Sequence, residues 1–229
     1  MNKLAFIFLV IITLSSCKNE NEMRINATIT GLKKGTVYLQ KISDSTLISL
    51  DSVIVNGNDS FSLTTEVKSP ELFYIYVDKV DGTDYNDRIQ FFGEKGEITF
   101  NTHLDKLNEK VIFTGSKSQK VFEQYNKAMK AVNTKLAQTQ VELLQAQANG
   151  DEELMIEADK QQIKLLKSKY LRAIQFALNN KRSPVAAYIG AREIPEANPK
   201  FLDSIYNGLS KKAKTTIYGQ ELKQLLKQQ

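Results

Sequence analysis

From Arg24 onward the spacing of apolar residues changes once, near Gly115, and this change is the strongest single guide to the fold. Between Arg24 and Thr114, apolar and polar residues alternate in short runs that are separated by turn residues. After Gly115, apolar residues recur every three or four positions over long stretches. Side chains repeat every two residues on a strand and about every 3.6 on a helix. We therefore expect an α+β chain in which a set of strands is followed by a set of helices.

Residues 24–114 predict an antiparallel β domain, sandwich-like or barrel-like. Short strands separated by turn residues are typical of both architectures. Asn56-Gly57 favours a hairpin between the third and fourth strands, because both residues tolerate positive φ. The turn at 93–96 is expected to join the sixth strand to the seventh. The predicted strands are residues 24–30, 36–42, 47–55, 60–67, 72–77, 85–92, 97–101 and 111–113.

Residues 115–229 predict a helical region, with a long hairpin over about 118–181 and short helices over about 184–229. Asn149-Gly150-Asp151 ends one helix of the hairpin and caps the next. Each helix carries a heptad-like stripe, and the spacing does not decide whether the stripes pair with each other or with a second copy. The first stripe is Phe122, Tyr125, Met129, Val132, Leu136 and Leu143; the second is Ile156, Ile163, Leu166, Tyr170, Ala173 and Ala177. Ser183-Pro184 and Asn198-Pro199 are expected to start two short helices, and a last one begins near Tyr218.

The first 17 residues predict an exported, lipid-modified protein. Lys3 precedes an apolar run at 4–14, which is long enough for a signal peptide but shorter than the roughly 20 residues that span a bilayer. The run ends in Leu-Ser-Ser-Cys at 14–17, which resembles the bacterial lipobox. The resemblance implies that 1–16 is a removed signal peptide, that Cys17 receives a diacylglyceryl group, and that 17–23 is a lipidated tether. A plain signal peptide with an ordinary cleavage site is the alternative.

The lipobox resemblance also implies a location. Several acyl chains anchor a protein far more firmly than one. Lys18 follows Cys17 in place of the Asp that favours inner-membrane retention in enteric-type lipoproteins. We therefore expect an outer-membrane lipoprotein of a Gram-negative-type cell envelope. The polar tract after Cys17 resembles the surface-export signal of some lipoproteins, so the periplasmic face and the cell surface both stay open.

The counts of cysteine and histidine limit the chemistry, because the chain has one of each. If Cys17 is acylated, no thiol remains for a disulfide, a zinc site or redox chemistry. A Ser-His-Asp site would have to use His103, whose position at the end of a predicted strand indicates a surface side chain. Catalysis by carboxylates alone stays open. We expect no enzyme activity, no metal and no cofactor.

The net charge of +5 is mildly basic and scattered. Small basic clusters at 181–182 and 211–214 lie near predicted helix ends, where they complement the helix dipole. No basic stripe or nucleic-acid-binding motif accompanies them, so nucleic acid is not an expected partner.

These segments, in this order, resemble a lipoprotein domain of unknown function that precedes AhpC/TSA-type, thioredoxin-like disulfide oxidoreductase modules. The resemblance covers most of 24–229. In longer members of that family a thioredoxin-like domain with Cys-x-x-Cys follows a segment like 218–222, whereas this chain ends at Gln229. The expectation is therefore the accessory part without the oxidoreductase activity. The carriers are 29–32 (ITGL), 37–39 (VYL), 51–57 (DSVIVNG) with Phe61, 113–116 (FTGS) and 183–188 (SPVAAY).

The expected function is a non-catalytic binding or scaffold role; the alternative is an accessory or docking component of a thioredoxin-like thiol-disulfide exchange system. Candidate surface residues for a ligand or partner are Tyr74, Tyr76, Phe91 and Phe92. Aromatic rings can line a binding cleft, but the same rings can also fill the core. Expected partners are the membrane, through the lipid, and either another envelope protein or a second copy that binds through the hairpin.

Overall fold

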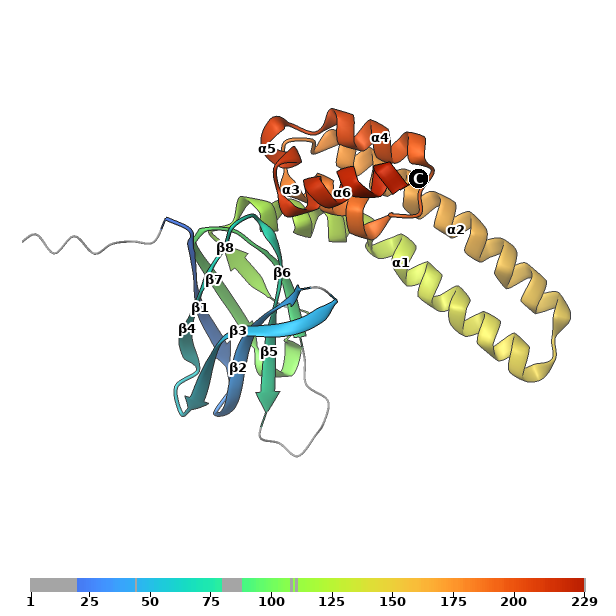
Figure 1. Ribbon diagram of the computed structural model, residues 1–229. Coiled ribbons are helices and arrows are strands. Elements are labelled where there is room, and N and C mark those ends of the chain that lie inside the picture. The colour runs from blue at the N-terminus through green and yellow to red at the C-terminus, as the bar shows by residue number, and fades with distance from the viewer. Residues whose placement is uncertain (1–19, 44, 80–87, 108, 110, 229) are drawn as a thin grey trace, which may run out of the picture.

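The computed structural model describes residues 20–228 except 44, 80–87, 108 and 110, and Figure 1 shows a β sandwich followed by helices. This arrangement confirms the predicted α+β class. The signal peptide, Cys17 and the first part of the tether lie outside the described residues, as do residues 85–87 of the sixth predicted strand. The strands are β1 Glu22–Thr30, β2 Lys34–Ser43, β3 Thr46–Asn56, β4 Ser60–Glu66, β5 Glu71–Lys79, β6 Arg88–Gly93, β7 Gly96–His103 and β8 Ile112–Thr114, with a 3-10 turn at Leu104–Lys106.

Two four-stranded sheets form the sandwich, in the orders β4-β1-β7-β8 and β3-β2-β5-β6. Ile25 and Phe100 from the first sheet and Val37 and Ile75 from the second meet in one buried cluster. All described pairs are antiparallel except β1 with β7, which run parallel with Ile25 opposite Ile98. The sequence did not predict this parallel pair, because alternation reports which side chains share a face and not which strands are neighbours.

Both predicted hairpins are wrong in their pairing. β3 and β4 lie in different sheets, and so do β6 and β7. At the first turn Gly57 donates its N–H to the Lys33 carbonyl (2.8 Å), which holds the turn beside β2. At the second, a Cβ on Gly93 would lie 2.6 Å from the Phe73 ring, so glycine lets the backbone pass close over the core. Each turn carries the chain across the sandwich, and local turn signals do not specify the sheet that the next strand joins.

The helical region consists of a long hairpin and a cluster of short helices beside the sandwich (Figure 1). The predicted end and start between the two long helices are confirmed: Gly150 has φ 67, and Asp151 accepts an N–H at the start of the second helix. At the start of the first helix, the Ser116 side chain accepts the Gln119 N–H. The π turn and α5 were not predicted. The bounds are α1 Lys117–Asn149, α2 Glu152–Asn179, α3 Pro184–Tyr188, a π turn at Ile189–Glu193, α4 Pro199–Gly208, α5 Lys211–Lys214 and α6 Ile217–Gln228.

The α2 stripe is only partly confirmed. Ala173 and Ala177 are buried, but Ile156 and Ile163 are 56% and 54% exposed. In the outer part of the hairpin, Ala158 is buried instead, and the Gln162 amide reaches across to Gln140 of α1 (2.8 Å). The reason is that the inner half of α2 packs on α1 and on the C-terminal helices at once. Near the sandwich the stripe therefore meets α1 and the C-terminal helices. Farther out, α1 contacts another side of α2 and the stripe is exposed.

Two hydrophobic clusters meet at the ends of β5 and β6. Leu72 and Phe92 come from the second sheet, yet they belong to the cluster of the helices. The Phe92 N–H donates to Oε1 of Gln119 (2.7 Å) and the Phe92 carbonyl accepts from the Ser116 hydroxyl (3.1 Å), both at the start of α1. Sandwich and helices are therefore joined by buried contacts. Among the described residues, none of the helices combines the length and the hydropathy of a transmembrane segment.

Candidate functional site

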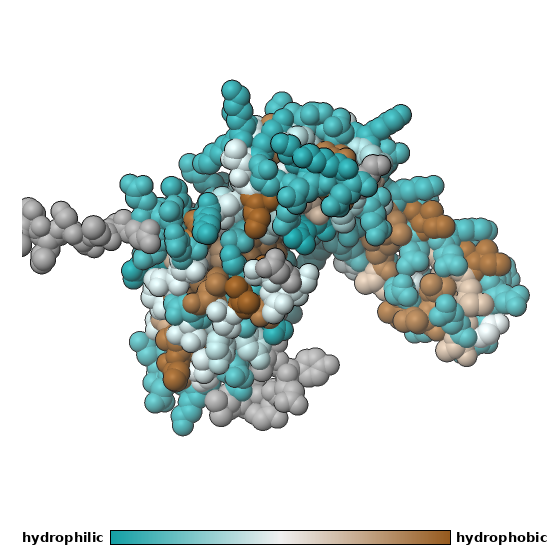
Figure 2. Space-filling view, in the orientation of Figure 1, coloured by the Kyte–Doolittle hydropathy of each residue, from teal (hydrophilic) through white to brown (hydrophobic). Residues whose placement is uncertain are grey.

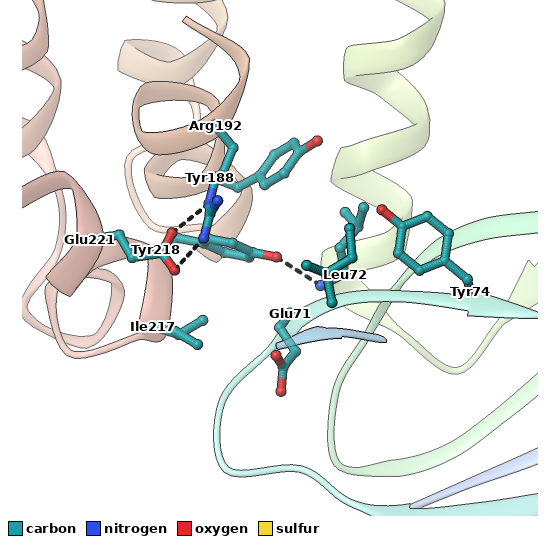
Figure 3. Close-up of a pocket in the computed structure, with 9 residues that line it drawn as sticks. Glu71, Leu72, Tyr74, Tyr188, Arg192, Ile217, Tyr218 and Glu221 are labelled. Atoms are coloured by element: carbon teal, nitrogen blue, oxygen red, sulfur yellow. Dashed lines mark hydrogen bonds and ion pairs between the residues drawn. The ribbon is translucent and has the colours of Figure 1, made fainter. Parts of the chain in front are cut away.

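A pocket of about 210 Å³ opens where β5 meets the C-terminal helices (Figure 3). Its walls come from β2 and β5 on the sandwich side, and from α3, the π turn and α6 on the helical side. It is lined by Ile42, Glu71, Leu72, Tyr74, Tyr188, Arg192, Ile217, Tyr218 and Glu221.

The strand period of β5 places the sandwich wall of the pocket. Phe73 and Ile75 are fully buried in the sandwich core. Leu72 and Tyr74 therefore point to the opposite face, which the helices partly cover. Leu72 donates its N–H to the hydroxyl oxygen of Tyr218 (3.1 Å), and this bond joins β5 to α6 (Figure 3). The direction of the β5 side chains and this one hydrogen bond thus set the width of the pocket.

Both carboxylates of the pocket are already paired. Arg192 donates two hydrogen bonds of 2.8 Å to Glu221, which ties the π turn to α6. These bonds raise the pKa of the Arg192 guanidinium above its usual value. Lys41 approaches Glu71 at 3.1 Å, where the Glu71 side chain is only 9% exposed. The mouth of the pocket therefore carries balanced ion pairs and no single dominant charge.

Aromatic rings form the inner wall. Tyr188 and Tyr218 meet edge to face with centroids 5.1 Å apart. The Tyr188 hydroxyl donates to Glu193 (2.7 Å) on the far side of its ring, so the ring and not the hydroxyl faces the pocket. Burial is the main cause that raises the pKa of both tyrosines above the ordinary value, and the hydroxyls stay protonated at neutral pH. The inner wall is therefore uncharged and largely apolar.

The four predicted aromatic residues do not form one surface. Tyr74 lines the pocket. Tyr76 lies farther along β5, under the Arg88 guanidinium (4.6 Å). Phe91 and Phe92 are fully buried, which corrects their place on a surface: Phe91 stacks on Phe113 in the sandwich and Phe92 packs on Phe122 among the helices. Successive residues on β6 point to opposite faces, and both faces are covered.

The remaining predicted residues lie elsewhere. Cys17 is outside the described residues. His103 is exposed at the end of β7, beside Leu104 and away from the pocket. Among the residues that the structure describes, no three His, Cys, Asp or Glu side chains gather as they would around a metal ion.

Sequence reasoning missed the helical side of the pocket. Arg192 and Glu221 lie 29 positions apart, on a π turn and a separate helix, so no local spacing links them. Tyr188 falls in a segment that carries the family resemblance and Tyr218 near the predicted start of the last helix, but neither belongs to a catalytic pattern. The only available signal was that Tyr188 and Tyr218 both lie near predicted helix starts, where aromatic residues of different helices can pack together.

Comparison with known proteins finds a family match in the first half of the chain. Residues 23–122 match the family model described as Domain of unknown function (DUF4369). The match covers the sandwich and the start of α1 through Phe122, and its pocket residues are Ile42, Glu71, Leu72 and Tyr74. No curated protein matches the chain.

Proposed function

We propose that this chain is a lipid-anchored protein of the cell envelope with a non-catalytic binding or scaffold role, and that the pocket between β5 and α6 receives an apolar side chain of a protein partner. The observation that carries the proposal is the combination of an uncharged aromatic wall with exposed isoleucines at the rim. Ile42 and Ile217 are 52% and 42% exposed. Contact with a partner would remove both from water.

The size of the pocket supports a side chain rather than a free small molecule. Pockets for drug-sized ligands measure about 300–1,000 Å³, and this one is about 210 Å³. The pairing of Arg192 with Glu221 and of Lys41 with Glu71 supports the same choice, because no unpaired charge is offered to an ionic ligand. Burial of apolar area would supply the affinity.

Anchoring through Cys17 is supported by the signal-like run at 4–14 and the Leu-Ser-Ser-Cys box. An extended residue spans at most about 3.6 Å, so the few residues between Cys17 and Glu22 would keep the start of β1 within about 20 Å of the lipid.

The anchor is tested by mass spectrometry of residue 17 in protein from native cells and by the variant Cys17→Ser. We expect diacylglyceryl Cys17 at the N-terminus of the native protein, and loss of the Cys17→Ser variant from the lipidated membrane fraction. Asn19→Ser is the control and keeps the anchor. An unmodified residue 17 in native material contradicts the proposal.

The pocket is tested by photo-crosslinking in cells from positions 42 and 217. Position 54 is the control, because Ile54 is 80% exposed on β3 but does not line the pocket. We expect one discrete product from both pocket positions, none from position 54, and loss of the product when Tyr74 is changed to Ala. Equal products from all three positions would show that the pocket does not select the partner. Recovery of a thioredoxin-like envelope protein would identify the partner that the family resemblance implies.

A further inference from the structure

The hairpin of α1 and α2 is divided into an acidic outer part and a basic inner part. Residues 136–159, around the tip, hold six acidic residues and no Lys or Arg. The inner segments 117–135 and 160–179 together hold ten Lys and Arg and one acidic residue, Glu123. The helix dipole favours such charges only in the first and last turns, and the change of sign falls between Asp159 and Lys160, well inside α2. The dipole therefore does not account for it.

An apolar stripe on α2 crosses the boundary between the acidic and basic parts and lacks a partner within the described chain. Ile156 and Ile163 are seven residues apart on α2, and both are more than half exposed. The contact with α1 uses Ala158 and Gln162 instead, so the two isoleucines point away from it. Figure 2 shows brown residues on the hairpin surface, and Val141 of α1 is also 52% exposed. Single exposed apolar residues are ordinary, but a heptad-spaced stripe indicates a helix partner.

The face of α2 that carries the two isoleucines is complementary to the same face of a second, antiparallel α2. Ile156 and Ile163 lie at equal distances from the point between Asp159 and Lys160, and so do Glu152 and Lys167. At 100° per residue these six side chains fall on one face of α2. Two antiparallel copies of α2, related by a two-fold axis at this point, would therefore place each isoleucine opposite an isoleucine and each acid opposite a base.

We propose that the partner of this face is a second copy of the same chain, and that α2 pairs with the antiparallel α2 of that copy in a two-fold dimer. A two-fold interface uses the same patch twice, so each favourable pair occurs twice. A parallel arrangement would place acid against acid and base against base, which is unfavourable. The two hairpins together form a four-helix assembly with the isoleucines inside. The dimer surface is separate from the pocket, so either proposal can fail alone.

Charge reversal tests the pairing without changing the core. The variant Lys160→Glu with Lys167→Glu makes the stripe acidic, and Glu152→Lys with Asp159→Lys makes it basic. The matched control is Glu157→Lys with Lys164→Glu, because these residues are exposed on the same segments but lie off the stripe. The measurement is density-matched sedimentation equilibrium of each processed full chain in detergent.

We expect a dimer for the native chain and for the control, self-association at least tenfold weaker for each charge variant, and a mixed dimer when the acidic and basic variants are combined. Higher salt should weaken the native dimer. A native chain that stays monomeric, a control that weakens association as much as the variants, or a mixture that stays monomeric would each overturn the proposal.

Discussion

Glu193 is the residue that links the long helices to the pocket. Its two carboxylate oxygens accept the hydroxyls of Tyr125 (3.2 Å) and Tyr188 (2.7 Å), and both tyrosines are buried. A buried hydroxyl that loses its acceptor costs about 1–3 kcal/mol. One carboxylate thus fixes two rings from elements far apart in the sequence.

Replacing Glu193 tests this role. Glu193→Leu should lower the free energy of unfolding by about 2–6 kcal/mol, because two hydroxyls lose their acceptor. Glu193→Gln should lower it less, because its amide oxygen still accepts. Urea unfolding followed by circular dichroism gives the values. Glu196→Leu, at an exposed position nearby, is the control and should have little effect. Equal losses for Glu193→Leu and Glu193→Gln would contradict the assignment.

The buried tyrosines predict a loss of stability at high pH. Burial, followed by the charge of Glu193, raises the pKa of Tyr125 and Tyr188 above 10.0. When the pKa of a group is higher in the folded than in the unfolded protein, the stability linked to that group is fully present below the unfolded pKa. This stability is lost as pH rises from the unfolded pKa through the folded pKa. The free energy of unfolding should therefore fall as pH rises above about 10. Tyr188→Phe should make this fall shallower, and an unchanged slope would contradict the prediction.

At the scale of the elements, the start of α1 depends on a residue outside the helix. Glu94, in the β6–β7 connection, accepts the Lys117 N–H (2.5 Å) and both the N–H and the hydroxyl of Ser118 (3.2 and 2.7 Å). Its Oε1 also lies 3.0 Å from the Ser116 hydroxyl, whose one hydrogen it shares with the Phe92 carbonyl. A negative charge at a helix N-terminus is favourable. The sandwich therefore caps the longest helix of the chain.

The Glu94→Ala variant should lower the free energy of unfolding by about 1–2 kcal/mol, which is the range for loss of a helix cap. Hydrogen exchange should locate the change in the first turn of α1. Lys95→Ala, at the neighbouring exposed residue, is the control. Unaltered exchange at the start of α1 would show that Ser116 caps the helix alone.

Gly115 joins β8 to α1 in a conformation that other residues rarely adopt. Its φ is +94, and a Cβ there would collide with the Glu97 carbonyl of β7. Gly115→Ala should therefore lower the free energy of unfolding, measured in urea, by about 1–3 kcal/mol or more. Gly208→Ala is the control, since its Cβ would meet only Leu178 at 3.7 Å, and it should be neutral or stabilising by up to about 1 kcal/mol. Equal effects would contradict this assignment.

At the scale of the whole molecule, Phe92 couples the sandwich to the helices. It contacts Phe122, Tyr188 and Tyr218 with centroids 5.8–5.9 Å apart, while its backbone belongs to β6. Strand β6 thus contributes side chains to both hydrophobic clusters. We expect the native chain to unfold in one transition.

The Phe92→Ala variant should lower the free energy of unfolding by about 3–5 kcal/mol. It should also separate the unfolding of the two clusters, so that the transitions followed by far-ultraviolet and near-ultraviolet circular dichroism no longer coincide. Phe91→Ala is the matched comparison, because Phe91 lies in the sandwich core alone. It should cost a similar amount and keep one transition. Coincident transitions in Phe92→Ala would show that other contacts couple the two parts.

Short-range patterns in the sequence were enough to predict the α+β class, most of the strands, the two long helices and the turn between them. These features depend on residues that are close in the sequence: alternation on β1, Asp151 at the start of α2, and Gly150 between the long helices. Backbone preferences and local hydrogen bonds act over a few residues, so a single sequence records them.

Packing between distant segments was needed to establish which sheet each strand joins, which side of α2 meets α1, and which aromatic rings are exposed. The turns at Gly57 and Gly93 reverse the chain in either case, but contacts with β2 and with Phe73 direct it into the other sheet. The pocket pairs Arg192 with Glu221 and Leu72 with Tyr218 over long separations. Such contacts form only when distant elements pack, and the free energy of that packing is shared over the whole core, so no local pattern records them.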